Sequence, residues 1–186
     1  NILDFDNLTE ENIYVLDSPI LTNSQFNKFK KFFSKKVKVI DCTFDIEKSL
    51  KERIELIRDE AETAVREGST CLVLSDKNIT NKKASIPSIL TVGAVHSHLV
   101  KHGLRGYCSL NVECCDAMDT HSFAILIGVG ATTVNPYLAI DSIYQRFEKK
   151  LFGKSDFETC VSKFKKSIDA GLLKIMSKMG ISVISS

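Results

Sequence analysis

Apolar residues along the chain gather into short runs of the length and type expected for β-strands. The run at 37–40 is rich in β-branched residues, which favour extended structure. The run at 71–74 is apolar throughout, as is typical of a parallel strand covered on both faces. Similar runs at 107–112 and 132–134 predict two further strands.

Helical spacing of apolar residues alternates with these runs. After the first strand, apolar residues recur at steps of three and four, which places them on one face of a helix that Gly68 ends. They are Ile46, Leu50, Ile54, Ile57, Ala61 and Ala64. A second helix is expected over 85–102, with Ser85 as its cap and Pro87 in its first turn. A third is expected over 119–129.

The C-terminal part of the chain contains the longest helical pattern. A capping box at 155–158 precedes apolar residues at helical spacing up to Met179, and Gly180 ends the pattern. Gly171 falls inside this helix and is expected to kink or divide it. The apolar segment 181–184 predicts one more strand. Because such a strand needs neighbours, we expect this chain to be part of a larger protein.

Alternating buried strands and amphipathic helices predict an α/β fold with a mainly parallel sheet flanked by helices. The pattern is compatible with a partial or open (β/α) barrel and with a doubly wound domain. We divide the chain into an irregular linker at 1–22, an α/β domain at 23–154, and the long helix with the start of a strand at 155–186.

Composition excludes several classes of partner and compartment. The formal net charge of +2 gives no electrostatic signature of binding to nucleic acid or to an anionic membrane. No apolar run approaches the roughly 20 residues of a membrane span. The six cysteines form no C-x-x-C pair and match no iron–sulfur spacing. They indicate a reducing compartment such as the cytoplasm.

Polar residues directly follow the predicted strands. Asp41, Asp76, Glu113 and Asn135 each come after an apolar run. In a parallel sheet they would gather at the carboxyl edge, where α/β proteins place ligand sites. The functional interpretation is a polar binding site. The structural interpretation is that these side chains cap helices and tie down loops, and the sequence leaves both open.

The histidines are the other candidates for chemistry. His98 and His102 are four residues apart on one predicted helix, so they share a face and could bind a metal ion. No third ligand is evident, and we assign no metal site. His96 falls in line with apolar positions of the same helix, which indicates a buried, hydrogen-bonded side chain. His121 starts the third helix, and we add His96 and His121 to the candidate polar site.

Motifs of common enzymes do not fit. The glycines at 128–130 follow a helix and precede a strand, whereas a dinucleotide fingerprint follows a strand and opens a helix. The sequence has no P-loop and no G-x-S-x-G nucleophile elbow. No catalytic residue and no cofactor-binding residue is assigned to this segment.

Longer strings carry a resemblance to one family. The stretch 86–99 resembles the "IP…LL…GAVHHHL" of glutamate synthase large subunits, and 121–124 resembles their "HHFA". The stretch 130–139 is similar to "GA…VNPYLA", and 171–182 to "KGLLKVMSKMGIST". The strings keep the family's order, and 18–21 also has a counterpart. The chain thus resembles the central domain of that subunit along nearly its whole length.

The resemblance implies a role inside a larger enzyme. In this family an amidotransferase with an N-terminal cysteine releases ammonia from glutamine. An FMN-binding (β/α)8 barrel with an iron–sulfur cluster then converts 2-oxoglutarate to glutamate, using electrons from NAD(P)H or ferredoxin. The central domain bridges the two, so these are the expected partners within the same polypeptide, and 155–186 would lead toward the barrel. A plastid location is also compatible with the family.

The sequence departs from the family pattern at two places. The stretch 113–119 differs from the "ETGEARE" of many relatives, and Ser97 replaces a frequent histidine. The first departure puts a family role for that loop in doubt.

Two hypotheses for the function of the chain remain. One is a bridging domain without catalysis of its own, and the other is a freestanding domain that binds a small molecule at the strand carboxyl ends.

Overall fold

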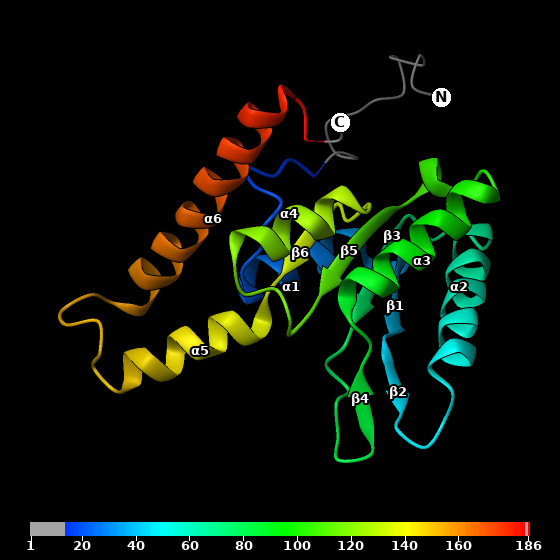
Figure 1. Ribbon diagram of the computed structural model, residues 1–186, viewed down its shortest axis with the longest axis horizontal. Helices are drawn as coiled ribbons and strands as arrows, with labels where there is room; N and C mark the ends of the chain where they lie inside the picture. Colours follow the sequence, from blue (N-terminus) through cyan, green and yellow to red (C-terminus); the bar gives the residue numbers. More distant parts are fainter. Residues whose placement is uncertain (1–13, 185) are drawn as a thin grey trace.

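Four parallel strands form the centre of the molecule, and they lie side by side in the order in which the chain makes them. The computed structural model describes residues 14–184 and 186 (Figure 1). The sheet has the order β1-β3-β5-β6, with every neighbouring pair parallel. Its strands are β1 (Val37–Asp41), β3 (Cys71–Ser75), β5 (Ser109–Glu113) and β6 (Thr133–Asn135). The predicted parallel sheet is therefore confirmed.

The strand order separates the two architectures that the sequence left open. A doubly wound sheet reverses its strand order at a switch point, whereas the strands of a (β/α) barrel follow one another around it. The four strands here are sequential and show no reversal. The fold is thus an open, partial barrel.

Helices cover both faces of this sheet. The chain forms α1 (Asn23–Phe33), α2 (Leu50–Arg66), α3 (Ser88–Lys101), α4 (Thr120–Gly128), α5 (Tyr137–Glu148) and α6 (Phe157–Met179). Because side chains alternate along a strand, Leu72 and Leu74 face one way and pack with α2, α3 and α4 in the main core. Cys71 and Val73 face the other way and pack under α1. This second face would line the interior of a complete barrel.

The face under α1 also contains a buried polar group. Asn111 is fully buried, and its amide oxygen accepts a hydrogen bond from Thr133 Oγ1 at 2.8 Å. Its amide nitrogen donates to Ser109 Oγ at 3.0 Å and to the Leu72 carbonyl at 3.1 Å. Buried polar groups are tolerated when they are paired in this way, so Asn111 ties three strands together.

Several elements were not predicted. Helix α1 was missed although Phe26, Phe29 and Phe33 recur along it at helical spacing. A capping box between Thr22 and Gln25 opens it. The sequence also missed α5 and a second, two-stranded antiparallel sheet. That sheet consists of β2 (Thr43–Asp45) and β4 (Lys83–Ser85), which are separated in the chain by α2 and β3.

The predicted linker at 1–22 is only partly covered by the structure, since residues 1–13, including Ile13, lie outside the described part. Residues 14–19 form no helix or strand. Ile20 makes an isolated parallel bridge to Val134, and the Leu21 amide donates to the Val134 carbonyl at 2.9 Å. The end of this segment therefore extends the sheet beyond β6.

The C-terminal helix is confirmed, but its surroundings differ from prediction. Helix α6 ends at Gly180 in the left-handed conformation, as expected. It is continuous, so Gly171 does not divide it. The predicted strand at 181–184 is wrong, because these residues form bends and a turn. The neighbouring sheet edge at β6 is already occupied by Ile20, which leaves no free partner there.

Two predicted helix caps are also wrong. Asp156, and not Ser155, caps α6 by accepting a hydrogen bond from the Thr159 amide at 2.7 Å. Helix α3 starts three residues later than predicted, because Ser85 belongs to β4. A distant side chain supplies that cap, since the Ser88 amide donates to Asp116 Oδ2 at 2.9 Å.

Candidate functional site

The last residues of the four strands form one row across the carboxyl edge of the sheet. Asp41 pairs in register with Ser75, Ser75 with Glu113, and Glu113 with Asn135. Residues paired in register point to the same face of a sheet. Three of the four predicted strand-end residues thus lie in this row. The fourth, Asp76, comes directly after Ser75 in the chain.

Glu113 is the most strongly paired member of the row. Its carboxylate accepts a hydrogen bond from Ser75 Oγ at 2.7 Å and lies 2.9 Å from Lys77 Nζ and 3.3 Å from Lys30 Nζ. Burial acts to raise the pKa of Glu113, but the bonds from Ser75 and Lys77 and the charge of Lys30 outweigh it, so the pKa lies below its ordinary value. The group is therefore an ionised carboxylate held by α1 and two strands.

Asp76 lies behind this row and is almost completely buried. Its Oδ2 atom accepts from Ser85 Oγ at 2.9 Å and from the Cys115 amide at 3.0 Å. Its Oδ1 atom has no hydrogen-bond partner among the described residues. Burial, and after it the Asp76 carboxylate, raise the pKa of the neighbouring Tyr137 hydroxyl, so Tyr137 remains a neutral phenol.

The other two strand-end residues secure loops. Asp41 Oδ1 accepts from the Thr43 amide at 3.0 Å and from Thr43 Oγ1 at 2.8 Å. The Asn135 amide nitrogen donates to the Leu21 carbonyl and to Asn23 Oδ1, both at 2.9 Å. These contacts match the structural interpretation of the strand-end residues, since each side chain holds the loop or helix beside it.

The cavity at this edge is small. It measures about 10 Å³ and is lined by Asp76 and Glu113 together with apolar residues of β3, β5 and α3. That is room for roughly one water molecule, whereas pockets for organic ligands measure about 300–1,000 Å³. This cavity is therefore too small for an organic ligand.

His96 is hydrogen-bonded, as predicted, but it is only half-buried. Arg105 Nε donates to His96 Nδ1 at 3.1 Å, which leaves the ring proton on Nε2. Burial, and then the charge of Arg105, lower the pKa of His96. The His96 ring also fills the space beside Gly130, which has a φ of +117°. His96 is thus part of a packing contact between α3 and the loop before β6, apart from the row.

His121 lies elsewhere. It is exposed at the start of α4 and lines a surface hollow of about 150 Å³ together with Asp116 and Ser122. The structure therefore does not bring His96 or His121 into the carboxyl-edge row.

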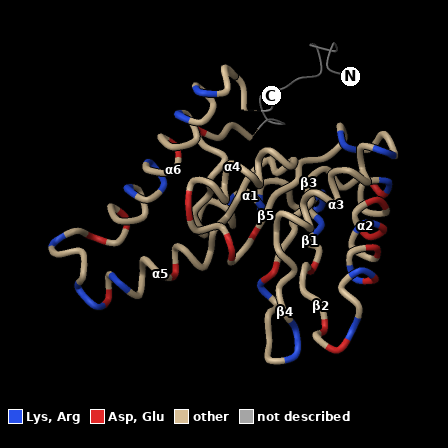
Figure 2. Tube along the Cα trace, viewed as in Figure 1, with Lys and Arg blue, Asp and Glu red and all other residues tan. Residues whose placement is uncertain are grey.

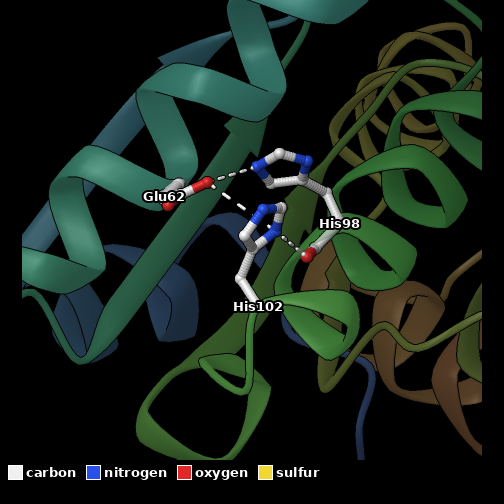
Figure 3. A group of neighbouring side chains, drawn as sticks. All are labelled: Glu62, His98 and His102. Atoms are coloured by element: carbon white, nitrogen blue, oxygen red, sulfur yellow. Dashed lines mark hydrogen bonds and ion pairs between the residues drawn. The ribbon is translucent and has the colours of Figure 1, made fainter.

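A different group of titratable side chains comes together between α2 and α3 (Figure 3). His98 Nε2 lies 2.6 Å from Glu62 Oε2, and His102 Nδ1 lies 3.8 Å from the same oxygen. Hydrogen bonding to Arg66, and then to His98, lowers the pKa of Glu62. The sequence missed Glu62 because it is one of many charged residues on its helix. Only the packing of α2 against α3 distinguishes it.

A larger hollow lies at the opposite edge of the sheet. A groove of about 490 Å³ runs between the 16–19 segment, the amino end of β6 and α6. It is lined by Leu16, Asp17, Ser18, Pro19, Thr132, Thr133, Asp169, Leu172, Leu173, Met176, Ser182 and Ile184. Ser18 Oγ donates to Asp169 Oδ1 at 2.6 Å across its wall.

The described residues do not fit a flavin or an iron–sulfur cluster. A flavin phosphate needs backbone amides or free cations at the strand ends. At this edge Lys30 and Lys77 are already paired with the Glu113 carboxylate, and Asp41 and Asp76 add further acidic groups. An iron–sulfur cluster needs several thiolates close together. Among the residues described, the only group of three or more metal-ligating side chains is Glu62 with His98 and His102.

Basic and acidic residues both occur along α2 and along the α5–α6 pair (Figure 2). Within the described chain, none of the helices combines the length and apolar content of a membrane span.

Comparisons with known proteins give the chain a family. The sequence profile of the family described as "Glutamate synthase central domain" matches residues 1–186. The chain is 47% identical, over its whole length, to the glutamate synthase [NADPH] large chain of Azospirillum brasilense, of which it covers 12%. It is 39% identical to the ferredoxin-dependent glutamate synthase of Pyropia yezoensis, again over its whole length, and covers 13% of that protein.

Solved structures support the barrel-like fold. A DHODH from Eimeria tenella matches 80% of the chain, which covers 35% of that protein, with a TM-score of 0.51 and 16% identity. A flavocytochrome b2 mutant matches the whole chain, which covers 41% of that protein, with a TM-score of 0.53 and 16% identity. At such identities these likenesses concern the fold alone. The match of the family profile and the identity to curated relatives are the stronger evidence, and they show that the chain belongs to the glutamate synthase central domain family.

Proposed function

We propose that this chain is a bridging domain within a glutamate synthase large chain and has no catalytic group of its own. The chain spans about an eighth of the length of the relatives it matches, 12% in one case and 13% in another. The family implies an amidotransferase and an FMN-binding barrel as its neighbours in the same polypeptide. The parent enzyme would make glutamate from glutamine and 2-oxoglutarate, with FMN and an iron–sulfur cluster held outside this segment.

One observation carries this proposal: the strings that resemble the family contact one another. His96 of the "GAVH" string packs against Gly130 of the "GA" string. Gly171 of the "GLLK" string packs against Thr120, beside the "HSFA" string. In a domain with a structural role, the residues that resemble the family are expected to pack against one another.

A third contact of this kind is the hydrogen bond from Ser18, in the first string, to Asp169 on α6. It joins the beginning of the described chain to its last helix. The residues that resemble the family are therefore engaged in contacts within the domain. Among those that the structure describes, no nucleophile is paired with a base.

The groove beside α6 supports a role in docking. Leu173, which lines it, is 66% exposed, and Met179 and Val183 after it in the chain are 68% and 55% exposed. Exposed large apolar side chains are typical of a surface that other protein covers. We propose that the remainder of the large chain covers it.

The carboxyl-edge residues can be tested within the parent enzyme. Asp76→Asn and Glu113→Gln should leave the kcat for glutamate formation within about threefold of wild type wherever the variant remains folded, because neither group would touch a reacting atom. A fall in kcat of more than about a hundredfold with an unchanged Tm would instead favour the small-molecule site at this edge.

The purified chain offers a second test. We expect no visible flavin absorbance and no glutaminase activity when residues 1–186 are produced alone. Stoichiometric FMN in that preparation would contradict the proposal.

The thiols support a reducing compartment. All six cysteines are free, and five of them are buried. Burial raises the pKa of Cys71 to about 11, so that thiol stays protonated and unreactive at neutral pH. We propose the cytoplasm or a plastid as the compartment.

A further inference from the structure

We propose that Glu62, His98 and His102 form a binding site for a divalent cation of the zinc class, which would clamp α2 to α3. The proposal goes beyond the bridging role and does not depend on it. It rests on an arrangement that neither helix shows alone, since the carboxylate comes from α2 and both imidazoles come from α3 or its end.

The spacing of the three side chains suits one small cation. Each residue offers a ligand atom, and these atoms lie within 4.8 Å of one another. Bonds of about 2.0–2.1 Å to a tetrahedral Zn²⁺ would place neighbouring ligand atoms roughly 3.3 Å apart. The present separations from Glu62 Oε2, 2.6 Å to His98 Nε2 and 3.8 Å to His102 Nδ1, bracket that value. Small side-chain rotations would therefore be enough.

His102 would bind the cation through Nδ1, the nitrogen whose distance to Glu62 is given above. That atom also lies 2.8 Å from the carbonyl oxygen of His98. A cation would therefore have to displace this hydrogen bond and the proton that makes it, which lowers the affinity of the site.

The chemistry of the three groups selects the class of cation. Two neutral imidazoles and one carboxylate suit Zn²⁺ and its neighbours better than Mg²⁺ or Ca²⁺, which prefer oxygen ligands. Three protein ligands leave a fourth position open to water. His102 is exposed and Glu62 is half-buried, so a cation can reach the group from solvent.

Two further features limit the affinity. Arg66 Nη2 lies 2.8 Å from Glu62 Oε1 and would be displaced or repelled by a cation. With a metal on Nε2, His98 must carry its proton on Nδ1, which is buried and has no partner among the described residues. We therefore expect weaker binding than in structural zinc sites, with a dissociation constant in the micromolar range.

Titration of the 186-residue chain, stripped of metal, tests the proposal. Zn²⁺ followed by calorimetry should bind at one equivalent per chain and raise the Tm. Co²⁺ should produce visible d–d absorption that Zn²⁺ abolishes. His102→Ala and Glu62→Gln should each weaken Zn²⁺ binding by at least about tenfold, the loss typical of removing or disturbing one ligand. His121→Ala, which removes an exposed histidine outside the group, should bind as wild type does.

Other outcomes would overturn the proposal. They are the absence of saturable binding at one equivalent, and binding in His102→Ala equal to wild type. Retention of binding in Glu62→Gln but not in His102→Ala would also overturn it, because the carboxylate would then be no ligand. Circular dichroism of each variant separates loss of a ligand from loss of fold, and His102→Ala is on the surface, where truncation is tolerated.

Discussion

The ring of His96 on α3 occupies the space that a side chain at Gly130 would need. Arg105 holds the two together, because its Nε donates to His96 Nδ1 at 3.1 Å and its Nη2 donates to the Gly130 carbonyl at 2.9 Å. The positive φ of Gly130, +117°, is itself a conformation that L-residues avoid. Residue 130 must therefore be glycine for two reasons: its backbone conformation is one that other residues avoid, and the His96 ring leaves no room for a side chain.

Gly130→Ala should destabilise the fold by about 2–4 kcal/mol, because the strain of the backbone adds to the steric conflict with His96. Chemical denaturation of the purified chain measures this change. Gly103→Ala is the matched control, since Gly103 also has positive φ, +67°, but has nothing within 4 Å of the added Cβ. It should lose only about 1 kcal/mol. Equal losses in the two variants would contradict a steric role for His96.

Two helical glycines should respond to alanine with opposite signs. A Cβ at Gly171 would lie 2.5 Å from Thr120 Cγ2, whereas a Cβ at Gly93 meets nothing within 4 Å. Gly93→Ala should therefore stabilise the fold by about 0.5–1 kcal/mol through helix propensity. Gly171→Ala should destabilise it by about 1–3 kcal/mol through overpacking of α6 against α4.

A double variant checks the cause of the second effect. Adding Thr120→Ala to Gly171→Ala removes the two closest contact atoms and should recover most of the lost stability. If the two single changes simply add, then Thr120 is not what excludes a side chain at residue 171.

Glu113→Gln should cost about 1–3 kcal/mol near neutral pH, since the buried carboxylate accepts from Ser75 and pairs with Lys30 and Lys77. Glu60→Gln removes only the half-exposed pair with Lys38 and should stay within about 0.5 kcal/mol of wild type. Urea unfolding of the three proteins makes the comparison. An equal effect of both substitutions would count against the buried network.

The contribution of Glu113 should also depend on pH in a defined direction. Its pKa in the folded state is below the ordinary value of 4.5, so the unfolded chain takes up the proton first as pH falls. The stabilising contribution is therefore complete above about pH 4.5 and is lost as pH falls through the folded pKa. The stability difference between wild type and Glu113→Gln should shrink over that range.

His96 should make the fold sensitive to mild acid. Its pKa in the folded state lies below the ordinary value of 6.5, so the unfolded chain again binds the proton more readily. Stability should fall as pH drops below about 6.5. His96→Gln should reduce this slope in urea unfolding, whereas His121→Gln, a change at an exposed histidine, should retain it. An unchanged slope in His96→Gln would show that another group is responsible.

Sequence patterns predicted the central strands within two residues, because a buried parallel strand must be apolar on both faces. They failed where an element depends on a partner. The segment 181–184 has the composition of a strand, but Ile20 already occupies the neighbouring edge. Ser85 looks like a cap, yet Asp116 performs that task from 28 residues away in the chain.

The candidate site was predicted only in part for the same reason. Strand ends place Asp41, Glu113 and Asn135 at one edge in any parallel sheet, so their proximity follows from the sequence. The groups that pair with them do not follow from the sequence, because Lys30 and Asn23 come from a helix that was not predicted. Glu62 became a candidate only through the packing of α2 against α3.

The sequence by itself determined the α/β class, the parallel strands, the long helix α6 and the resemblance to a family. These follow from local periodicity and from strings of residues, which are properties of the chain alone. Tertiary structure decided the open barrel order of the strands, the close contacts at Gly130 and Gly171, and the meeting of Glu62 with His98 and His102. Such features depend on which elements pack together, and periodicity along one chain carries no information about distances between its elements.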